Sequence, residues 1–148
     1  MVWNKKGFTI AELMVTLAII GILFATAVPV YHTWQQRAYG SEAAIMLKQL
    51  ISAEISYYLE NDEYFPKDVV YEIYHDGAQI PGEAVKNVKD NLKIEIPQGH
   101  FIDYQLSYDE KGDFILNISS SGDFEIFKGT RHVSAHLDKE GKVTIYIP

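Results

Sequence analysis

The feature that most constrains this chain is a long uncharged stretch near its N-terminus, with one carboxylate directly before it. No Asp, Glu, Lys or Arg occurs from Leu13 to Gln36, and this length is sufficient for a helix to cross a bilayer. Glu12 stands at the start of the stretch, and Lys5 and Lys6 precede it. A charged side chain costs roughly 2.5–3.5 kcal/mol at the bilayer centre on insertion scales, so such a residue indicates a function and needs a partner.

Two interpretations of this segment use only its general pattern. A secretory signal peptide would have the two lysines as its charged region, residues 13–24 as its apolar core and Ala25-Thr26-Ala27 as its cleavage site. Glu12 at the start of that core and Pro29 soon after the cut disfavour this interpretation. A plain membrane anchor with a cytoplasmic N-terminus explains the lysines and the apolar run, but it gives Glu12 no role.

A third interpretation rests on a resemblance to a known family. The segment Gly7-Phe8-Thr9-Ile10-Ala11-Glu12, the apolar run and Ala27-Val28-Pro29 closely resemble the N-terminal signature of type IV prepilins. The resemblance implies that a prepilin peptidase removes residues 1–7 by cutting after Gly7 and methylates the new N-terminal residue, Phe8. It also implies that Glu12 is the assembly residue. The short leader is typical of the type IVa branch, and the resemblance extends over roughly residues 5–65.

The spacing of Phe8 and Glu12 gives the resemblance a physical meaning. The two residues are four positions apart, so they share one face of a helix. Cleavage after Gly7 creates an α-amino group on Phe8, and a cation and a carboxylate in hydrocarbon each need a counter-charge. The two groups can pair within one chain or between staggered chains. Our hypothesis is the pairing between adjacent subunits, because it would set the register of a filament.

Gly21 and Pro29 lie within the apolar run and have two explanations. Glycine allows close packing of membrane helices, and proline removes the hydrogen bond to the Ala25 carbonyl. The resemblance implies instead that both residues weaken the helix, so that the stretch between them can extend when chains pack in a filament. The sequence does not separate these explanations.

The helical pattern continues beyond the apolar run without a linker. We expect one helix over residues 8–60, apolar on all sides in residues 8–36 and amphipathic afterwards. The segment Asn61–Pro66 ends it, since proline disfavours helical geometry in the preceding residue. The predicted apolar stripe of its second half consists of Ala44, Leu47, Ile51, Ile55 and Tyr58.

The rest of the chain changes to an alternating pattern. Residues 61–91 are expected to form an irregular connecting region with a short helix near Glu83–Asp90, and residues 92–147 an antiparallel sheet. The sheet has one apolar face, which the amphipathic half of the helix can cover. The predicted strands carry the alternating sets Leu92/Ile94/Ile96, Ile102/Tyr104/Leu106/Tyr108, Phe114/Leu116/Ile118, Phe124/Ile126, Val133/Ala135/Leu137 and Val143/Ile145/Ile147.

These elements predict an α+β fold in which a long N-terminal helix packs on a C-terminal antiparallel sheet, as in pilins. The expected organisation is a leader (residues 1–7), a transmembrane and filament-core half-helix (residues 8–36) and a globular head (residues 37–148).

Composition excludes several classes of function. The 148 residues carry a net charge of −7, which disfavours direct binding to nucleic acid. Without cysteine, the chain has neither disulfides nor a thiolate metal site. Many type IVa pilins have a disulfide-closed C-terminal loop that is tied to adhesion, so that role does not transfer to this chain.

We find no catalytic constellation in the sequence, and we expect no enzymatic activity, no cofactor and no metal ion. His132 and His136 would share the outer face of a strand, and a solvated pair is the preferred interpretation. The segment Asp109–Asp113 offers oxygen ligands, but it is too short for an EF-hand loop and Lys111 interrupts it, so we expect an ordinary hairpin turn.

The sequence therefore predicts a type IVa-like pilin that serves adhesion, twitching motility or DNA uptake. The expected partners are other copies of the chain, the prepilin peptidase, the inner-membrane assembly machinery and, before assembly, the cytoplasmic membrane. After assembly the protein would be in an extracellular pilus. The alternatives are a minor pilin at the filament tip, a pseudopilin of a type II secretion system in a periplasmic filament, and a membrane-anchored binding module that does not polymerise.

Overall fold

The computed structural model describes residues 7–75, 81–97, 101–122, 124–127 and 129–147. The chain divides into two compact units, Met1–Gln35 and Gln36–Pro148. The longest element, α1 (Ile10–Asn61), begins in the first unit and ends in the second.

The first unit consists of the apolar part of α1. It contains a segment that is long and apolar enough to cross a membrane, with a mean hydropathy of 2.5, and no residue of that segment is buried. Large side chains such as Leu13, Ile19 and Phe24 are more than half exposed. Since water does not solvate such a surface well, this part of α1 needs a cover from outside its own chain.

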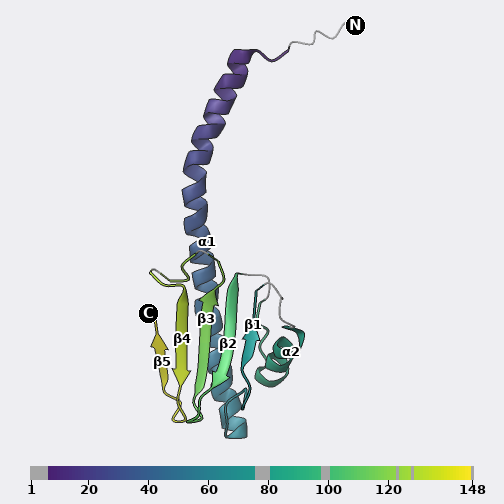
Figure 1. Ribbon diagram of the computed structural model, residues 1–148, viewed down its shortest axis with the longest axis vertical. Helices are drawn as coiled ribbons and strands as arrows, with labels where there is room; N and C mark the ends of the chain where they lie inside the picture. The colour runs from purple at the N-terminus through teal and green to yellow at the C-terminus, as the bar shows by residue number, and fades with distance from the viewer. Residues whose placement is uncertain (1–6, 76–80, 98–100, 123, 128, 148) are drawn as a thin grey trace. The chain divides into compact units, whose positions relative to one another are not determined.

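The second unit is built on a five-stranded antiparallel sheet in which every strand pairs with its neighbours in the chain, in the order β1-β2-β3-β4-β5 (Figure 1). A second helix, α2 (Pro81–Leu92), lies beside β1. The strands are β1 (Tyr71–Ile73), β2 (Ile102–Tyr108), β3 (Phe114–Ser120), β4 (His132–Leu137) and β5 (Val143–Tyr146).

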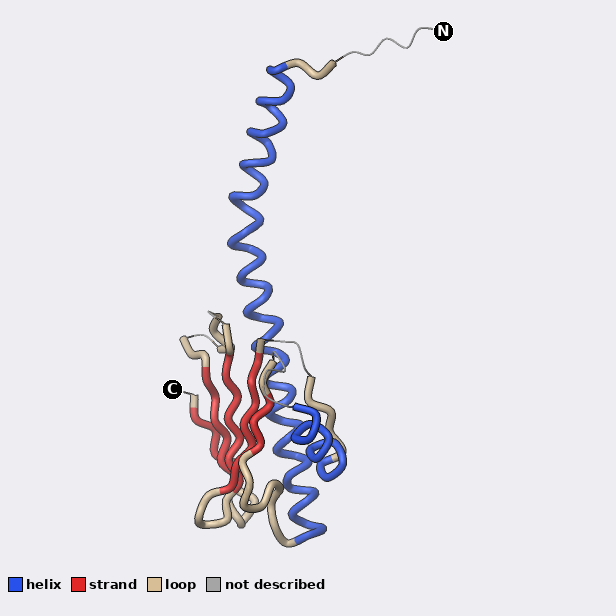
Figure 2. The backbone as a smooth tube through the Cα atoms, turned by 45° about the vertical axis from the view of Figure 1, so that its right-hand side comes forward, coloured by secondary structure: helices blue, strands red, loops and turns tan. Residues whose placement is uncertain are grey.

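The second half of α1 covers the apolar face of this sheet, as predicted (Figure 2). Leu50 of α1, Leu106 of β2 and Leu116 of β3 are all fully buried in the shared core. Each leucine that is removed from water in this way contributes roughly 1.5–3 kcal/mol. The buried side of the helix includes the predicted Leu47 and Ile51, but Ala44 is exposed and Ala43 is buried in its place.

The opposite face of the sheet carries a ladder of hydrogen-bonded polar side chains. Glu72, Gln105, Asn117 and Ser134 lie directly opposite one another on β1 to β4. Gln105 donates to Glu72 (3.0 Å), Asn117 to Gln105 (2.8 Å) and Ser134 to Asn117 (2.7 Å), and the Ser134 hydroxyl also lies 2.8 Å from His132 Nε2. The ladder ties four strands together on the polar side.

Two predicted strands are wrong. Residues 92–96 form no strand, because Leu92 ends α2 and Lys93 adopts a left-handed conformation (φ 58°) whose amide bonds back to Lys89. Leu92 and Ile96 are both buried, so their spacing reflects core packing of an irregular segment. In addition, β1 was missed within the region that we expected to be irregular.

Phe124 and Ile126 also lie outside any strand, because their segment crosses over α1. The Ile126 carbonyl approaches Gly40 so closely that a Cβ on Gly40 would lie 2.2 Å from it. The ring of Phe124 stacks on Tyr39 with centroids 4.6 Å apart. Gly40 therefore allows the backbone of Ile126 to pack closely on α1 within the head. The alternating apolar residues Phe124 and Ile126 reflect this tertiary contact and not a strand.

The hairpins β2–β3 and β4–β5 use the same five-residue turn. Asp109 Oδ1 accepts the backbone N–H groups of residues 111 and 113, and Asp138 Oδ1 those of residues 140 and 142. The fourth residue is Gly112 (φ 87°) or Gly141 (φ 79°), since few other residues adopt these angles without strain. The hairpin turn expected at Asp109–Asp113 is confirmed.

A buried carboxyl group lies on the core face of α1. Glu54 has no exposed surface, and its Oε2 accepts the backbone N–H of Phe65 at 3.0 Å, which holds the segment after α1 against the helix. Its Oε1 has no hydrogen-bond partner among the described residues. Burial raises the pKa of Glu54 to about 8, although the hydrogen bond from Phe65 opposes this change. Glu54 is therefore protonated at neutral pH.

This raised pKa predicts that alkaline pH destabilises the head. The unfolded chain loses the Glu54 proton near pH 4.5 and the folded chain near pH 8, so the free energy of unfolding falls as pH rises between these values. Since a tenfold change in proton affinity is worth about 1.4 kcal/mol, the full loss is roughly 4–5 kcal/mol. Glu54→Gln should unfold at a higher temperature than the wild type above pH 8 and at the same temperature below pH 4.5.

Thermal unfolding of the full chain in detergent micelles, followed by near-ultraviolet circular dichroism, measures this difference. Glu60→Gln is the matched control, because Glu60 is an exposed carboxylate on the same helix. Parallel pH profiles for the wild type and Glu54→Gln would contradict the prediction.

Candidate functional site

The site predicted from the sequence lies at the beginning of α1. Thr9 precedes the first helical residue, and the Glu12 backbone N–H donates to Thr9 Oγ1 at 3.2 Å. In return, Glu12 Oε2 accepts the Thr9 backbone N–H at 2.9 Å and the Thr9 hydroxyl at 2.7 Å. This reciprocal arrangement is a capping box, in which two side chains satisfy backbone N–H groups that have no partner in the first helical turn.

The capping box is the functional feature that our sequence analysis missed. Its signal was present, because Thr9 and Glu12 have the spacing Ser/Thr-x-x-Glu directly before an apolar run. The finding gives Glu12 a role within its own chain. The carboxylate also stabilises the positive end of the helix dipole.

The predicted processing residues lie immediately before the cap. Gly7 and Phe8 are exposed, with 72% of the Phe8 surface accessible, and neither belongs to the helix. The remainder of the predicted leader, residues 1–6, lies outside the described residues. Both capping contacts of the Glu12 carboxylate end on Oε2, so Oε1 takes no part in the cap. Glu12 can thus cap its own helix and still present an oxygen to a cation.

Gly21 and Pro29 both lie inside α1, which is helical through both positions. A Cβ on Gly21 would meet no atom within 4 Å, so nothing in its own chain requires glycine there. Around Pro29, hydroxyl groups bond to backbone carbonyls, Thr26 to Leu23 at 3.0 Å and Thr33 to Pro29 at 3.1 Å. In an apolar segment, such hydroxyls can hydrogen-bond to backbone carbonyls in place of a helical N–H group. The helix near Pro29 could therefore lose some of its own hydrogen bonds without leaving every carbonyl unpaired.

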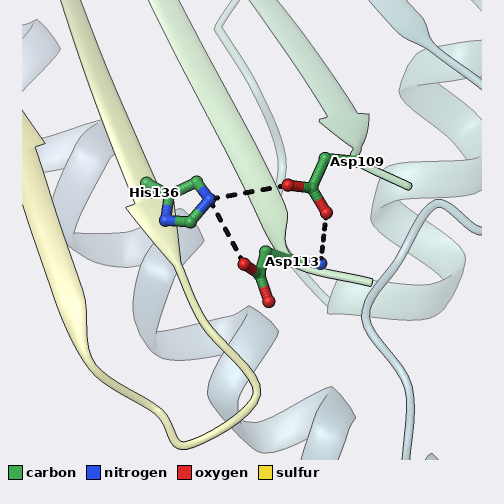
Figure 3. Close-up of side chains that lie close together, drawn as sticks. All are labelled: Asp109, Asp113 and His136. Carbon is green, nitrogen blue, oxygen red and sulfur yellow. Dashed lines mark hydrogen bonds and ion pairs between the residues drawn. The ribbon is translucent and has the colours of Figure 1, made fainter. Parts of the chain in front are cut away.

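His132 and His136 share the outer face of β4, as predicted, but they contact different residues. His132 contacts Ser134 in the polar ladder, whereas His136 Nε2 faces Asp109 and Asp113 (Figure 3). His75 is paired with Asp103 at 3.0 Å, and His100 lies outside the described residues.

Comparisons with known proteins bear on the beginning of α1. Residues 4–28 match the family model of the prokaryotic N-terminal methylation motif. The chain is 42% identical over 85 residues to the type IV major pilin protein PilE of Neisseria gonorrhoeae, a match that covers 57% of this chain and 50% of that protein.

Two further relatives extend this likeness. A fimbrial protein of Neisseria meningitidis serogroup B is 39% identical over 85 residues, which cover 57% of this chain and 49% of that protein. The type IV major pilin protein PilA of Myxococcus xanthus is 48% identical over 61 residues, or 41% and 28% of the two chains. The chain spans about half the length of the Neisseria relatives, and no solved structure matches it.

The capping box predicts that Thr9→Val frays the start of α1. The substitution keeps the side-chain size but removes the hydroxyl that accepts the Glu12 N–H, and loss of such a cap typically costs about 1 kcal/mol. Hydrogen exchange at the amides of Glu12 and Leu13, measured by NMR in micelles, should accelerate about fivefold. Thr9→Ser, which keeps a hydroxyl, should exchange like the wild type. Unchanged exchange in Thr9→Val would mean that Thr9 does not stabilise the first turn.

Proposed function

We infer that this chain, which belongs to the type IV pilin family, is a structural subunit of a type IV pilus and polymerises through α1. The observation that carries this proposal is the methylation motif over residues 4–28, because Gly7, Phe8 and Glu12 lie within it at the start of an uncovered apolar helix. Such a subunit acts by assembling, so we propose no catalytic role and no cofactor for it.

The proposal begins with processing at the membrane. The prepilin peptidase removes residues 1–7 and methylates the amino group of Phe8. Exposure of Gly7 and Phe8 supports this step, because a peptidase needs an extended and accessible backbone at the bond that it cuts. Residues 8–36 remain in the cytoplasmic membrane until assembly, and residues 37–148 form the head on its outer side.

Assembly then replaces lipid by neighbouring subunits around the apolar half of α1. None of the membrane-length segment is buried within the chain, so either lipid or other helices must cover it. Extraction from a bilayer is unfavourable for such a segment unless an equivalent apolar environment is available in the filament. We propose that the filament core is a bundle of these half-helices, formed with the help of the inner-membrane assembly machinery, and that the stretch between Gly21 and Pro29 extends as the helices pack.

The carboxylate of Glu12 provides the register of this bundle. Once the leader is removed, the amino group of Phe8 is a cation just before the cap, and Glu12 Oε1 is not engaged by the cap. We propose that Glu12 pairs with the Phe8 amino group of an adjacent subunit, since an unpaired charge in an apolar core is strongly unfavourable. In each subunit, the charges of Glu12 and of the Phe8 amino group are then neutralised only when a neighbouring subunit is present.

The mature filament is extracellular and serves adhesion, twitching motility or DNA uptake. Names of the relatives favour a pilus subunit over a type II secretion pseudopilin and over an anchored module that does not polymerise. The net charge of −7 makes direct contact between the shaft and nucleic acid unfavourable, so a role in DNA uptake would be exerted through other components.

Processing predicts a defined N-terminus. Intact-mass analysis of exported protein should show a chain that begins at Phe8 and carries one added methyl group. Gly7→Val should block cleavage, because a branched side chain is introduced at the cut, and the full-length chain should accumulate in the cytoplasmic membrane. A mature chain that begins at Val28 would indicate an ordinary signal peptide and contradict the proposal.

Charge pairing predicts that Glu12→Gln and Thr9→Val differ in assembly. Glutamine keeps the acceptor that caps Thr9 but carries no charge, whereas valine removes the hydroxyl and leaves the carboxylate charged. Sheared surface filaments should fall at least tenfold for Glu12→Gln and less than threefold for Thr9→Val. In a cryo-electron microscopy map, the Glu12 carboxylate should lie within about 4 Å of the amino group of a neighbouring Phe8.

Two results would contradict the proposed pairing between Glu12 and Phe8 of adjacent subunits. If Glu12→Gln filaments formed at wild-type yield and symmetry, the charge would not direct assembly. If the carboxylate contacted only the Phe8 amino group of its own chain, the pairing between subunits would be wrong even though the protein forms a pilus.

A further inference from the structure

Three side chains with metal-binding atoms meet on the polar side of the head. Asp109 begins the β2–β3 turn, Asp113 ends it, and His136 lies on β4 opposite Ile115 and Thr144 (Figure 3). The His136 Nε2 atom is 3.5 Å from Asp113 Oδ2 and 3.9 Å from Asp109 Oδ2. Each of the three residues offers one ligand atom, and all three atoms lie within 4.8 Å of one another.

These distances suit a shared cation better than direct contacts between the side chains. Direct hydrogen bonds to an imidazole nitrogen have lengths of about 2.7–3.2 Å, which both distances exceed. A tetrahedral ion with bonds of about 2.0–2.2 Å holds its ligand atoms about 3.3–3.6 Å apart. The Asp113–His136 separation of 3.5 Å falls in that interval, whereas the Asp109–His136 separation of 3.9 Å lies slightly above it.

The turn fixes two of the ligands before any ion arrives. Asp109 uses Oδ1 for the backbone of residues 111 and 113, so Oδ2 is left to face His136. Asp113 lies at the other end of the same turn, and its Oδ2 is 3.5 Å from His136 Nε2.

The β4–β5 hairpin shows that the turn alone does not produce this cluster. It has the same hydrogen bonds around Asp138, but its fifth residue is Lys142, where the β2–β3 turn has Asp113. The second carboxylate and the facing imidazole are thus particular to one of two matched turns. The difference lies in the ligands and not in the backbone.

We propose that Asp109, Asp113 and His136 bind a divalent first-row transition cation, of which Zn²⁺ is the representative. The imidazole distinguishes the site from one for Ca²⁺ or Mg²⁺, because those hard cations take oxygen ligands. One imidazole and two carboxylates suit Zn²⁺, and the three side chains are 14–32% exposed, so water can complete the coordination. This inference departs from our expectation of a metal-free head and does not depend on the proposed function.

A lysine beside the same turn should weaken the site. A Cβ on Gly112 would lie 2.4 Å from Lys139 Cε and 2.7 Å from its Nζ, so the ammonium group lies beside Gly112, within the turn that joins Asp109 to Asp113. A positive charge there opposes the approach of a second cation. Lys139→Gln should therefore strengthen Zn²⁺ binding severalfold without altering any of the three ligands.

The experiment is calorimetric titration of Zn²⁺ into the full chain in detergent micelles at pH 7.5. We expect one ion per chain, an affinity at least tenfold lower for Asp113→Asn and for His136→Gln, and a severalfold higher affinity for Lys139→Gln. His132→Gln is the matched control, since His132 lies on the same face of β4 but contacts Ser134, and its affinity should equal that of the wild type. A hundredfold excess of Ca²⁺ or Mg²⁺ should not displace Zn²⁺.

A second readout does not depend on the folding of the variants. In NMR spectra of the wild type, Zn²⁺ should shift the ring resonances of His136 at the first equivalent and leave those of His132 in place. Absence of Zn²⁺ binding, or equal affinity of His136→Gln and the wild type, would overturn the proposal. It would also be overturned by Ca²⁺ binding that survives His136→Gln, which would make the turn an oxygen-only site.

Discussion

Packing of the second half of α1 on β2, β3 and β4 is the interaction on which the head depends. Without cysteine, no covalent link supports the fold, so buried side chains such as Leu50 and Leu116 must supply its stability. The same interface contains Glu54, whose carboxyl group holds Phe65 and the segment that leads from the helix to the sheet. The contact that organises the head therefore also couples its stability to pH.

The beginning of α1 faces a different physical problem, because none of its membrane-length segment is buried among the described residues. In the filament that we propose, Glu12 serves two purposes there. Its Oε2 completes the cap with Thr9, and its charge remains available for a cation from outside the chain. A rigid first turn would hold that charge at a fixed place relative to Phe8, which is a condition for a well-defined filament register.

Much of this arrangement was predictable from the sequence, because long periodic patterns report on burial. The extended apolar run, the helix that covers the sheet and strands β2 to β5 follow from periods of 3.6 and two. Failures occurred where tertiary contacts imitate a strand, as at Ile96 and Ile126, both buried without strand pairing. Burial of Glu54 and the approach of His136 to Asp113 depend on packing between distant segments, so no local pattern indicated them.

The repeated hairpin turn has a consequence for how the surface of the head can change. Its geometry is secured by the first aspartate and by the glycine in the fourth place, as Asp109 with Gly112 and Asp138 with Gly141 show. The remaining positions carry Glu, Lys and Asp in one copy and Lys, Glu and Lys in the other, yet both copies have the same hydrogen bonds. Side chains at these positions can therefore be substituted without changing the turn. The hairpin ends are thus suitable places to introduce charges, labels or ligands on the surface of a filament.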